Sequence, residues 1–151
     1  MAKFGLVVRD DPPRVIDFNS RQWGEPADGW ALSIEVLPGR DPGDPSALSV
    51  VLRNVAPTPQ TLRIPGWLAL YRLEVADASG TPVPLTGFGR TSLDPARQTG
   101  TEVTLQPGAG HDTMIPLGSF FDLKPRGNYR VKASATPGTA TLTSNTATIT
   151  T

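Results

Sequence analysis

The clearest pattern in the chain is alternation of apolar and polar residues, and it is most regular in two segments. From Tyr71 to Val75 every second residue is apolar, and Arg72 and Glu74 lie between them. A period of two places alternate side chains on opposite faces of a strand. Because the preceding residues, Trp67 to Leu70, are apolar on both faces, the whole segment predicts a central strand with one face on the core along its length.

The second regular segment is Asn128–Ala135, in which Tyr129 and Val131 alternate with Arg130 and Lys132. It predicts another central strand. We expect the two segments to be neighbours in the middle of the fold, each with its tyrosine side on a shared core.

Shorter alternating or apolar runs, separated by turn-forming residues, predict further strands. They lie at Phe4–Val8, Val15–Phe18, Trp30–Leu37, Ala47–Val55, Thr61–Ile64, Thr81–Leu85, Thr101–Leu105, Thr113–Leu117 and Thr139–Thr151. In Trp30–Leu37 and Ala47–Val55 we expect the serines to face outward. Thr81–Leu85 contains two prolines, which cannot both sit inside a ladder, so it is expected to be an edge strand.

Composition supports an all-β fold in one domain. A chain of 151 residues with 16 prolines and 15 glycines has little room for long helices. We expect residues 30–151 to form the domain and residues 1–29 to form an N-terminal arm and linker with an edge strand. That strand either folds back on its own domain or adds to the sheet of a neighbouring subunit. Trp23, among turn formers, is expected to plug one end of the core.

Charge and cysteine content exclude several classes of function. The 14 basic and 14 acidic residues cancel, and no stretch gathers the cations typical of a nucleic-acid binder. Without cysteine there is no disulfide, thiolate nucleophile or sulfur-ligated zinc. No run reaches the roughly 20 apolar residues of a membrane span. As written the chain is expected to be cytoplasmic, or at the cell surface or in the periplasm if a native leader was removed.

One stretch carries a resemblance to a known family. Leu123–Val131 resembles the approach to strand F in immunoglobulin-like and fibronectin type III-like modules. In those families a tyrosine at this corner hydrogen-bonds to the chain just upstream, and Tyr129 matches it. Val131 stands where true immunoglobulin domains have a cysteine. The resemblance implies a two-sheet antiparallel immunoglobulin-like sandwich of roughly seven to nine strands.

The order of strands and turns from Trp30 to the end is also similar to bacterial β-sandwich accessory modules. A weaker similarity links it to the intracellular proteinase inhibitors of bacilli. These resemblances imply a fold rather than an activity, because such sandwiches serve adhesion, assembly, inhibition and carbohydrate contact.

The chain has few candidates for catalysis. The single histidine, His111, lies beside Asp112 and a few residues before Ser119 and Asp122. A serine–histidine–aspartate set could be drawn from them, but no Gly-x-Ser-x-Gly turn is present. The four glutamates do not form an obvious pair for glycoside hydrolysis; they are Glu25, Glu35, Glu74 and Glu102. We predict that the protein is not an enzyme.

Aspartates occur in small groups that could bind calcium. They are Asp10 and Asp11, Asp41 and Asp44, and Asp77. None has the spacing of a calcium loop, and Asp-Pro and Asp-x-x-Gly are common turn sequences. The interpretation is that they form turns, with no metal and no cofactor.

The long polar segment Gly87–Gly100 is expected to be the least structured part of the domain and its first contact surface. Phe88, between two glycines, is the aromatic residue expected to be exposed. The other aromatic residues, including Trp30, Trp67, Phe120 and Phe121, are mostly assigned to the core. The candidate contact residues are Phe88, Arg90, Leu93 and Arg97 in this segment and Arg40 and Asp41 in an earlier loop.

The leading functional hypothesis is a non-catalytic module that binds another protein or itself, with a structural or assembly role in a bacterial envelope or a multi-subunit complex. One alternative is a protease inhibitor that presents a proline-rich loop, Pro38–Pro45 or Ala56–Pro65. A second alternative is carbohydrate binding through exposed aromatic rings.

Overall fold

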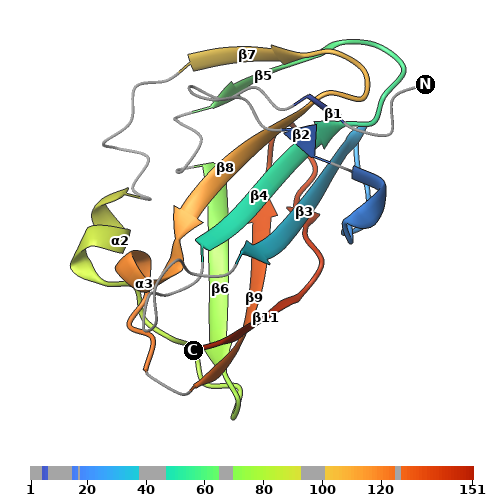
Figure 1. The fold of residues 1–151 in the computed structure, drawn as a ribbon. Coiled ribbons are helices and arrows are strands. Elements are labelled where there is room, and N and C mark those ends of the chain that lie inside the picture. Colours follow the sequence, from blue (N-terminus) through green and yellow to red (C-terminus); the bar gives the residue numbers. More distant parts are fainter. Residues whose placement is uncertain are drawn as a thin grey trace.

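A computed structural model describes residues 5–6, 15–16, 18–37, 47–64, 70–92, 101–124 and 127–151. Within these residues the chain is all-β, with antiparallel strands and three short helical turns (Figure 1). The strands are β1 (Gly5–Leu6), β2 (Val15–Ile16), β3 (Trp30–Leu37), β4 (Ala47–Asn54), β5 (Gln60–Ile64), β6 (Tyr71–Asp77), β7 (Thr101–Leu105), β8 (Gly110–Pro116), β9 (Asn128–Ala135), β10 (Leu142–Thr143) and β11 (Ala147–Thr150). The helical turns are η1 (Phe18–Ser20), α2 (Gly87–Ser92) and α3 (Leu117–Phe120).

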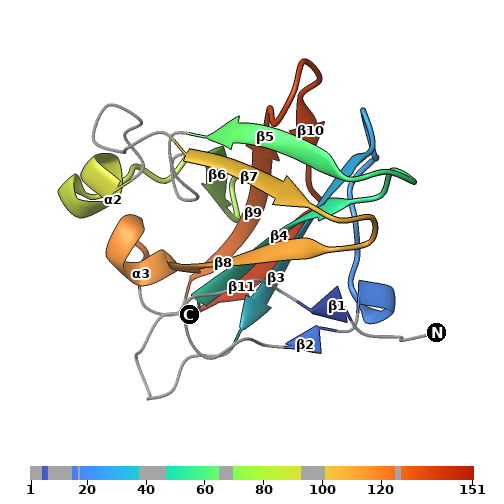
Figure 2. The ribbon, with the colours of Figure 1, turned by 90° about the horizontal axis from the view of Figure 1, so that it is seen from above.

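Two larger sheets and two strand pairs account for all the described strands. The first sheet has the order β3-β4-β8. In the second, β9 pairs with β6 on one side and with β10 and β11 on the other. Strands β5 and β7 pair beside these sheets, and β1 pairs with β2 (Figure 2). The prediction that the two most regular segments are neighbours is confirmed, because β6 and β9 pair along their length.

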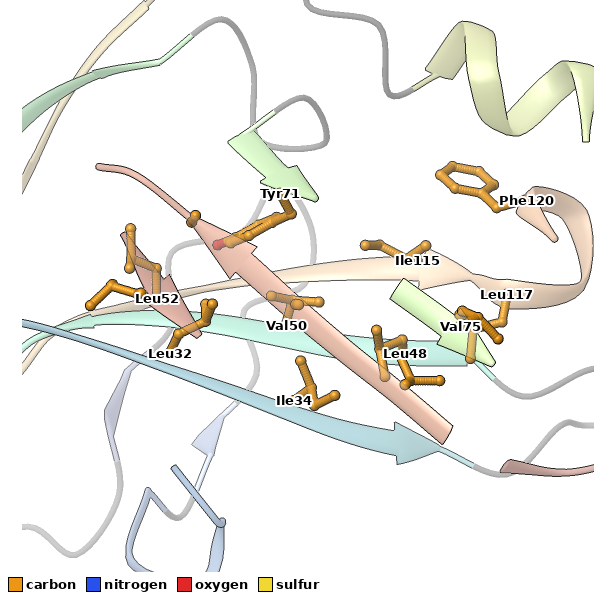
Figure 3. Packing of buried hydrophobic residues seen from close by; sticks show 14 of the residues in the cluster. Leu32, Ile34, Leu48, Val50, Leu52, Tyr71, Val75, Ile115, Leu117 and Phe120 are labelled. Atoms are coloured by element: carbon orange, nitrogen blue, oxygen red, sulfur yellow. The ribbon is translucent and has the colours of Figure 1, made fainter. Parts of the chain in front are cut away.

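The core lies between the inner faces of the two larger sheets (Figure 3). Leu32, Val50 and Ile115 come from the three strands of the first sheet, and Val75 and Val131 from the second. All five are almost completely buried. Each such side chain contributes roughly 1.5 to 3 kcal/mol relative to an exposed position, so this layer holds the domain together.

A buried asparagine, Asn54, ends β4 and holds the turn through which the chain passes to β5. The Asn54 amide donates to the carbonyl oxygens of Thr58 and Leu105, both at 2.9 Å. Its side-chain oxygen accepts the backbone N–H of Ala56 and the side-chain amide of Gln60. The side chain therefore supplies hydrogen-bond partners to backbone groups in the turn between β4 and β5 and at the end of β7.

The outer face of the first sheet is covered, which the sequence did not predict. Ser33 and Ser49 were expected to face solvent, but both are fully buried. The Arg21 guanidinium lies over them and donates to the hydroxyls of Ser33 at 2.9 Å and Ser49 at 3.1 Å. It also pairs with Glu35 at 3.3 Å, and Ser49 donates to Asp112. Small serines at diagonally neighbouring outward positions of β3 and β4 leave room for this arginine.

A small apolar cluster holds the same N-terminal segment to this face. Phe18 packs on Val51, and the Trp23 ring meets Phe18 edge to face, with 5.7 Å between ring centroids. The guanidinium of Arg53 lies 4.6 Å above the Phe18 ring. The prediction that Trp23 plugs one end of the main core is wrong, because Trp23 packs on the outside of the first sheet.

Other differences from the prediction concern edges and helices. Strand β6 is an edge strand, since within the described residues its ladder is with β9 and only an isolated bridge joins Ala76 to Pro82. Thr81–Leu85 forms two isolated bridges rather than a strand. The closing segment is two short strands, β10 and β11. Between them Asn145 leaves the sheet and makes two hydrogen bonds to Ile34 on the edge of β3.

The turn held by Asn54 generates a first prediction. Asn54→Ala leaves the buried carbonyl group of Leu105 and the part-buried backbone groups of Ala56 and Thr58 without these partners, so the free energy of unfolding should fall by about 2 to 4 kcal/mol. Urea unfolding monitored by tryptophan fluorescence measures this. The matched control is Asn128→Ala, an exposed asparagine that accepts one hydrogen bond from Thr150, with an expected loss under about 1 kcal/mol. Equal losses in the two variants would contradict the role of Asn54.

Candidate functional site

The most exposed large apolar side chain among the described residues is Phe88, on α2, with 61% of its surface accessible. Its ring meets Phe120 of α3 edge to face, with 5.4 Å between centroids. Aromatic pairs of this geometry stabilise each other by about 0.5 to 1.5 kcal/mol. The Phe88 ring is therefore mostly exposed and at the same time held in place by its contact with Phe120.

The helix that carries Phe88 is fixed to α3 by hydrogen bonds. The Thr86 hydroxyl accepts the N–H of Gly89 at 3.0 Å, as a helix N-cap does, and donates to the Ser119 carbonyl oxygen at 2.6 Å. The Thr86 N–H donates to the Phe120 carbonyl oxygen at 2.8 Å. A Cβ at position 89 would collide with that oxygen, so only glycine allows this approach.

Arg90 lies exposed on the same helix and donates to the Leu85 carbonyl oxygen at 2.7 Å. The structure thus places Phe88 and Arg90 together on a helix, Gly87–Ser92, which is the described part of the segment Gly87–Gly100 that was predicted to be the least structured. We call Thr86, Phe88, Arg90 and Thr91 the α2 surface. The other predicted contact residues, Leu93, Arg97, Arg40 and Asp41, lie outside the described residues.

A second surface feature is a groove on the outer face of the β6–β9 pair. Its floor carries the exposed side chains of Arg72 and Glu74 from β6 and Arg130 and Lys132 from β9. The register places Glu74 directly opposite Lys132. We call this feature the β6–β9 groove.

The groove is made of two adjoining hollows of about 620 Å³ and about 330 Å³. They share Arg72, Glu74 and Lys132. Pro82 and Val83, held to the edge of β6 by a hydrogen bond from the Val83 N–H to the Val75 carbonyl oxygen, form one wall of the larger hollow. Threonines line the remaining sides; they are Thr141, Thr143 and Thr146.

Two buried tyrosines lie on the inner side of the same pair of strands. The Tyr129 hydroxyl accepts the backbone N–H of Lys124 at 2.7 Å, which is the upstream bond that the immunoglobulin-like resemblance implies. The Tyr71 hydroxyl has no hydrogen-bond partner among the described residues. Burial raises the pKa of Tyr71 far above its usual range; the Asp112 charge adds to this, and the nearby Thr113 hydroxyl opposes it in part.

The candidate catalytic residues are distributed over different elements. His111 and Asp112 are consecutive residues of β8, so their side chains leave opposite faces of the sheet. The Asp112 carboxylate accepts a hydrogen bond from Ser49 on the outer face. The His111 ring lies 3.4 Å from the Thr113 hydroxyl. Ser119 belongs to α3, and Asp122, which follows α3, pairs with Lys124 at 3.8 Å.

The described aspartate among the calcium candidates is a turn residue. Asp77 accepts the N–H groups of Ser79 and Thr81 and the Ser79 hydroxyl, and these bonds lower the pKa of its carboxyl. Within the described residues no three histidine or acidic side chains gather as a metal site. Asp10, Asp11, Asp41 and Asp44 lie outside the described residues.

Of the two loops predicted for a protease inhibitor, the structure describes only the second. Pro38–Pro45 lies outside the described residues. Half of Ala56–Pro65 is not a loop, because Gln60–Ile64 is β5, and Leu62 and Ile64 are buried in the core. A short turn around Pro57, braced by Asn54, remains exposed.

The sequence analysis predicted neither the groove nor the set of polar contacts that Arg21 makes with Ser33, Ser49 and Glu35. The charged residues of β6 and β9 were assigned to outward positions, but single-strand patterns do not show which outward positions face each other. The available signal was that two strands expected to be neighbours both carry charged residues at their outward positions. If such strands pair, those charges share one face of the sheet.

No protein-family model matches the chain, and comparison with curated proteins gave no match. No described helix has both the length and the apolar character needed to cross a bilayer.

The two tyrosines generate a prediction with opposite signs. Tyr129→Phe leaves the Lys124 N–H without its partner and should lower the free energy of unfolding by about 1 to 2 kcal/mol at pH 7. Tyr71→Phe removes a buried hydroxyl that has no partner among the described residues and should be neutral or stabilising by up to about 1 kcal/mol. Urea unfolding compares the two variants. A large loss in Tyr71→Phe and none in Tyr129→Phe would contradict this assignment.

The pH dependence of stability should distinguish Tyr71→Phe from the wild type at alkaline pH. The pKa of Tyr71 is raised in the folded protein, so its phenol ionises first in the unfolded chain. The stability it supports is therefore complete below about pH 10 and is lost as the pH rises above that value. Unfolding measured between about pH 8 and pH 11 should show a smaller loss of stability in Tyr71→Phe than in the wild type. Parallel curves would contradict the raised pKa.

Proposed function

We propose that the chain is a non-catalytic immunoglobulin-like β-sandwich module that acts by protein–protein contact, with a structural or assembly role. The observation that carries this proposal is Phe88, a mostly exposed aromatic ring held in place by Phe120 and by the hydrogen bonds of Thr86. Aromatic anchors of this kind dominate the energetics of protein interfaces.

The rigidity of the α2 surface supports a role in contact. A flexible loop loses conformational freedom when it binds, at roughly 0.5 to 1.5 kcal/mol for each side chain that becomes ordered. The α2 backbone is fixed through the N-cap at Thr86 and the close approach at Gly89, so most of that cost is met on folding.

The arrangement of the strands supports the sandwich. Two antiparallel sheets face each other across one core, and Tyr129 makes the corner hydrogen bond of immunoglobulin-like modules. Such modules commonly present loops and short helices at their ends as contact surfaces while the sheets supply a rigid frame.

The simplest partner is a second copy of the chain. Contact of two α2 surfaces about a twofold axis would place Phe88 on Phe88 and bury both rings. The carbohydrate alternative has less support, because among the described aromatic side chains Phe88 is the single one classed as exposed and no row of rings forms a platform.

Self-association gives the test of this proposal. Sedimentation velocity from about 10 µM to about 500 µM should show a rise in mean mass for the wild type. Phe88→Ala should raise the dissociation constant by about tenfold or more, because the anchor is lost. Its stability should fall by no more than about 1.5 kcal/mol, the contribution of the ring pair with Phe120, since most of the ring is in solvent.

The matched control is Val55→Ala, which removes the other large exposed apolar side chain of the described residues, 44% accessible, outside the α2 surface. This variant should associate as the wild type does. A wild type that stays monomeric throughout the concentration range, or an equal loss in both variants, overturns the proposal.

A further inference from the structure

Among the described residues, the lining of the β6–β9 groove has a surplus of positive charge. Arg72, Arg130 and Lys132 face one carboxylate, Glu74, although the whole chain is neutral. Within the described part of the chain none of these four side chains forms an ion pair or a hydrogen bond. Exposed cations gathered in a hollow without internal partners attract anionic groups.

The spacing of these charges is set by the strand geometry. Arg130 and Lys132 are two positions apart on β9, which separates them by about 7 Å along the strand. An extended peptide that has acidic residues at every second position presents its carboxylates at the same interval. From Arg72 to Ala76 the β6 side of the floor is long enough for about five or six extended residues.

The lining of the groove favours a peptide over other polyanions. No aromatic ring lines either hollow within the described residues, so there is no stacking surface for sugars or bases. Glu74 lies in the middle of the floor, where it repels a uniformly charged phosphate or sulfate chain but leaves room for a neutral residue. The threonine hydroxyls on the sides can donate to and accept from peptide groups.

We propose that the β6–β9 groove binds an extended acidic peptide segment of a partner protein, with Arg130 and Lys132 pairing alternate carboxylates and Arg72 a third. This inference rests on the proposed function in taking the partner to be a protein. The surface is formed by different elements from the α2 surface, so each can fail without the other.

The binding test uses short synthetic peptides of about six residues. One alternates glutamate and threonine, a second has the same composition with the glutamates contiguous, and a third alternates lysine and threonine. Fluorescence anisotropy at about 20 mM and about 150 mM salt measures affinity. Amide chemical shifts in ¹⁵N-labelled protein locate the site. The alternating acidic peptide should bind about threefold or more tightly than the contiguous one, and should shift amides of β6, β9 and Thr146.

Charge variants identify the groups involved. Arg130→Gln and Lys132→Gln should each weaken binding about three- to tenfold, and Glu74→Gln should strengthen it about two- to fivefold. The matched control is Arg63→Gln, an exposed arginine on β5 outside the groove, which should leave the affinity unchanged. Phe88→Ala should also bind the peptide as the wild type does.

Three results would overturn the inference. The first is the absence of shifts in β6 and β9 at any peptide concentration. The second is an equal loss in Arg63→Gln. The third is tighter binding of heparin or polyphosphate with no preference between the two acidic peptides, which would indicate a general polyanion site. Peptide binding that fails while Phe88-dependent association persists removes this inference alone; the reverse result removes the proposed assembly alone.

Discussion

The register of β6 against β9 is the constraint on which the rest of the structure depends. It places Val75 opposite Val131 with both side chains in the core, and Glu74 opposite Lys132 with both on the outer face. A shift of one residue would move Arg72 and Glu74 toward the core if β6 turned over, or Arg130 and Lys132 if β9 did, at several kcal/mol for each buried charge. The same register that completes the core therefore assembles the charged floor of the groove.

The faces of the two sheets are used differently. The outer face of the first sheet is closed by residues 18–23, through the Phe18 cluster and the Arg21 hydrogen bonds. The free edge of β3 is occupied by Asn145, which bonds both backbone groups of Ile34. The outer face of the second sheet and the α2 surface are left exposed, and these are the surfaces on which contact is proposed.

Part of this arrangement follows from the sequence. The alternation in β3, β4, β6 and β9 was sufficient to predict strands and their core-facing residues, because a period of two is a local property. The adjacency of β6 and β9 was expected from their being the two most regular segments, and the ladder between them confirms it. The α2 helix was not predicted, since Gly87 and Gly89 disfavour helices and the stabilising contacts come from α3, about thirty residues later in the chain. Tertiary contacts of that kind leave no local pattern.

Two of the candidate contact residues lie in the described part of the chain. Phe88 and Arg90 are both exposed on one helix, and their exposure was expected from the turn-forming residues around them. The groove could not be predicted, because that requires knowing which outward residues of β6 and β9 lie opposite each other. Arg21 was missed for the same reason, because its partners Ser33 and Ser49 belong to strands that only folding brings beneath it.

The most direct test of the account is measurement of cross-strand nuclear Overhauser effects between β6 and β9 in labelled protein. The account predicts contacts between backbone protons of Glu74 and Lys132 and of Val75 and Val131, as the register requires. Contacts that instead join Glu74 to Val131, or the absence of any contact between the two strands, would contradict it.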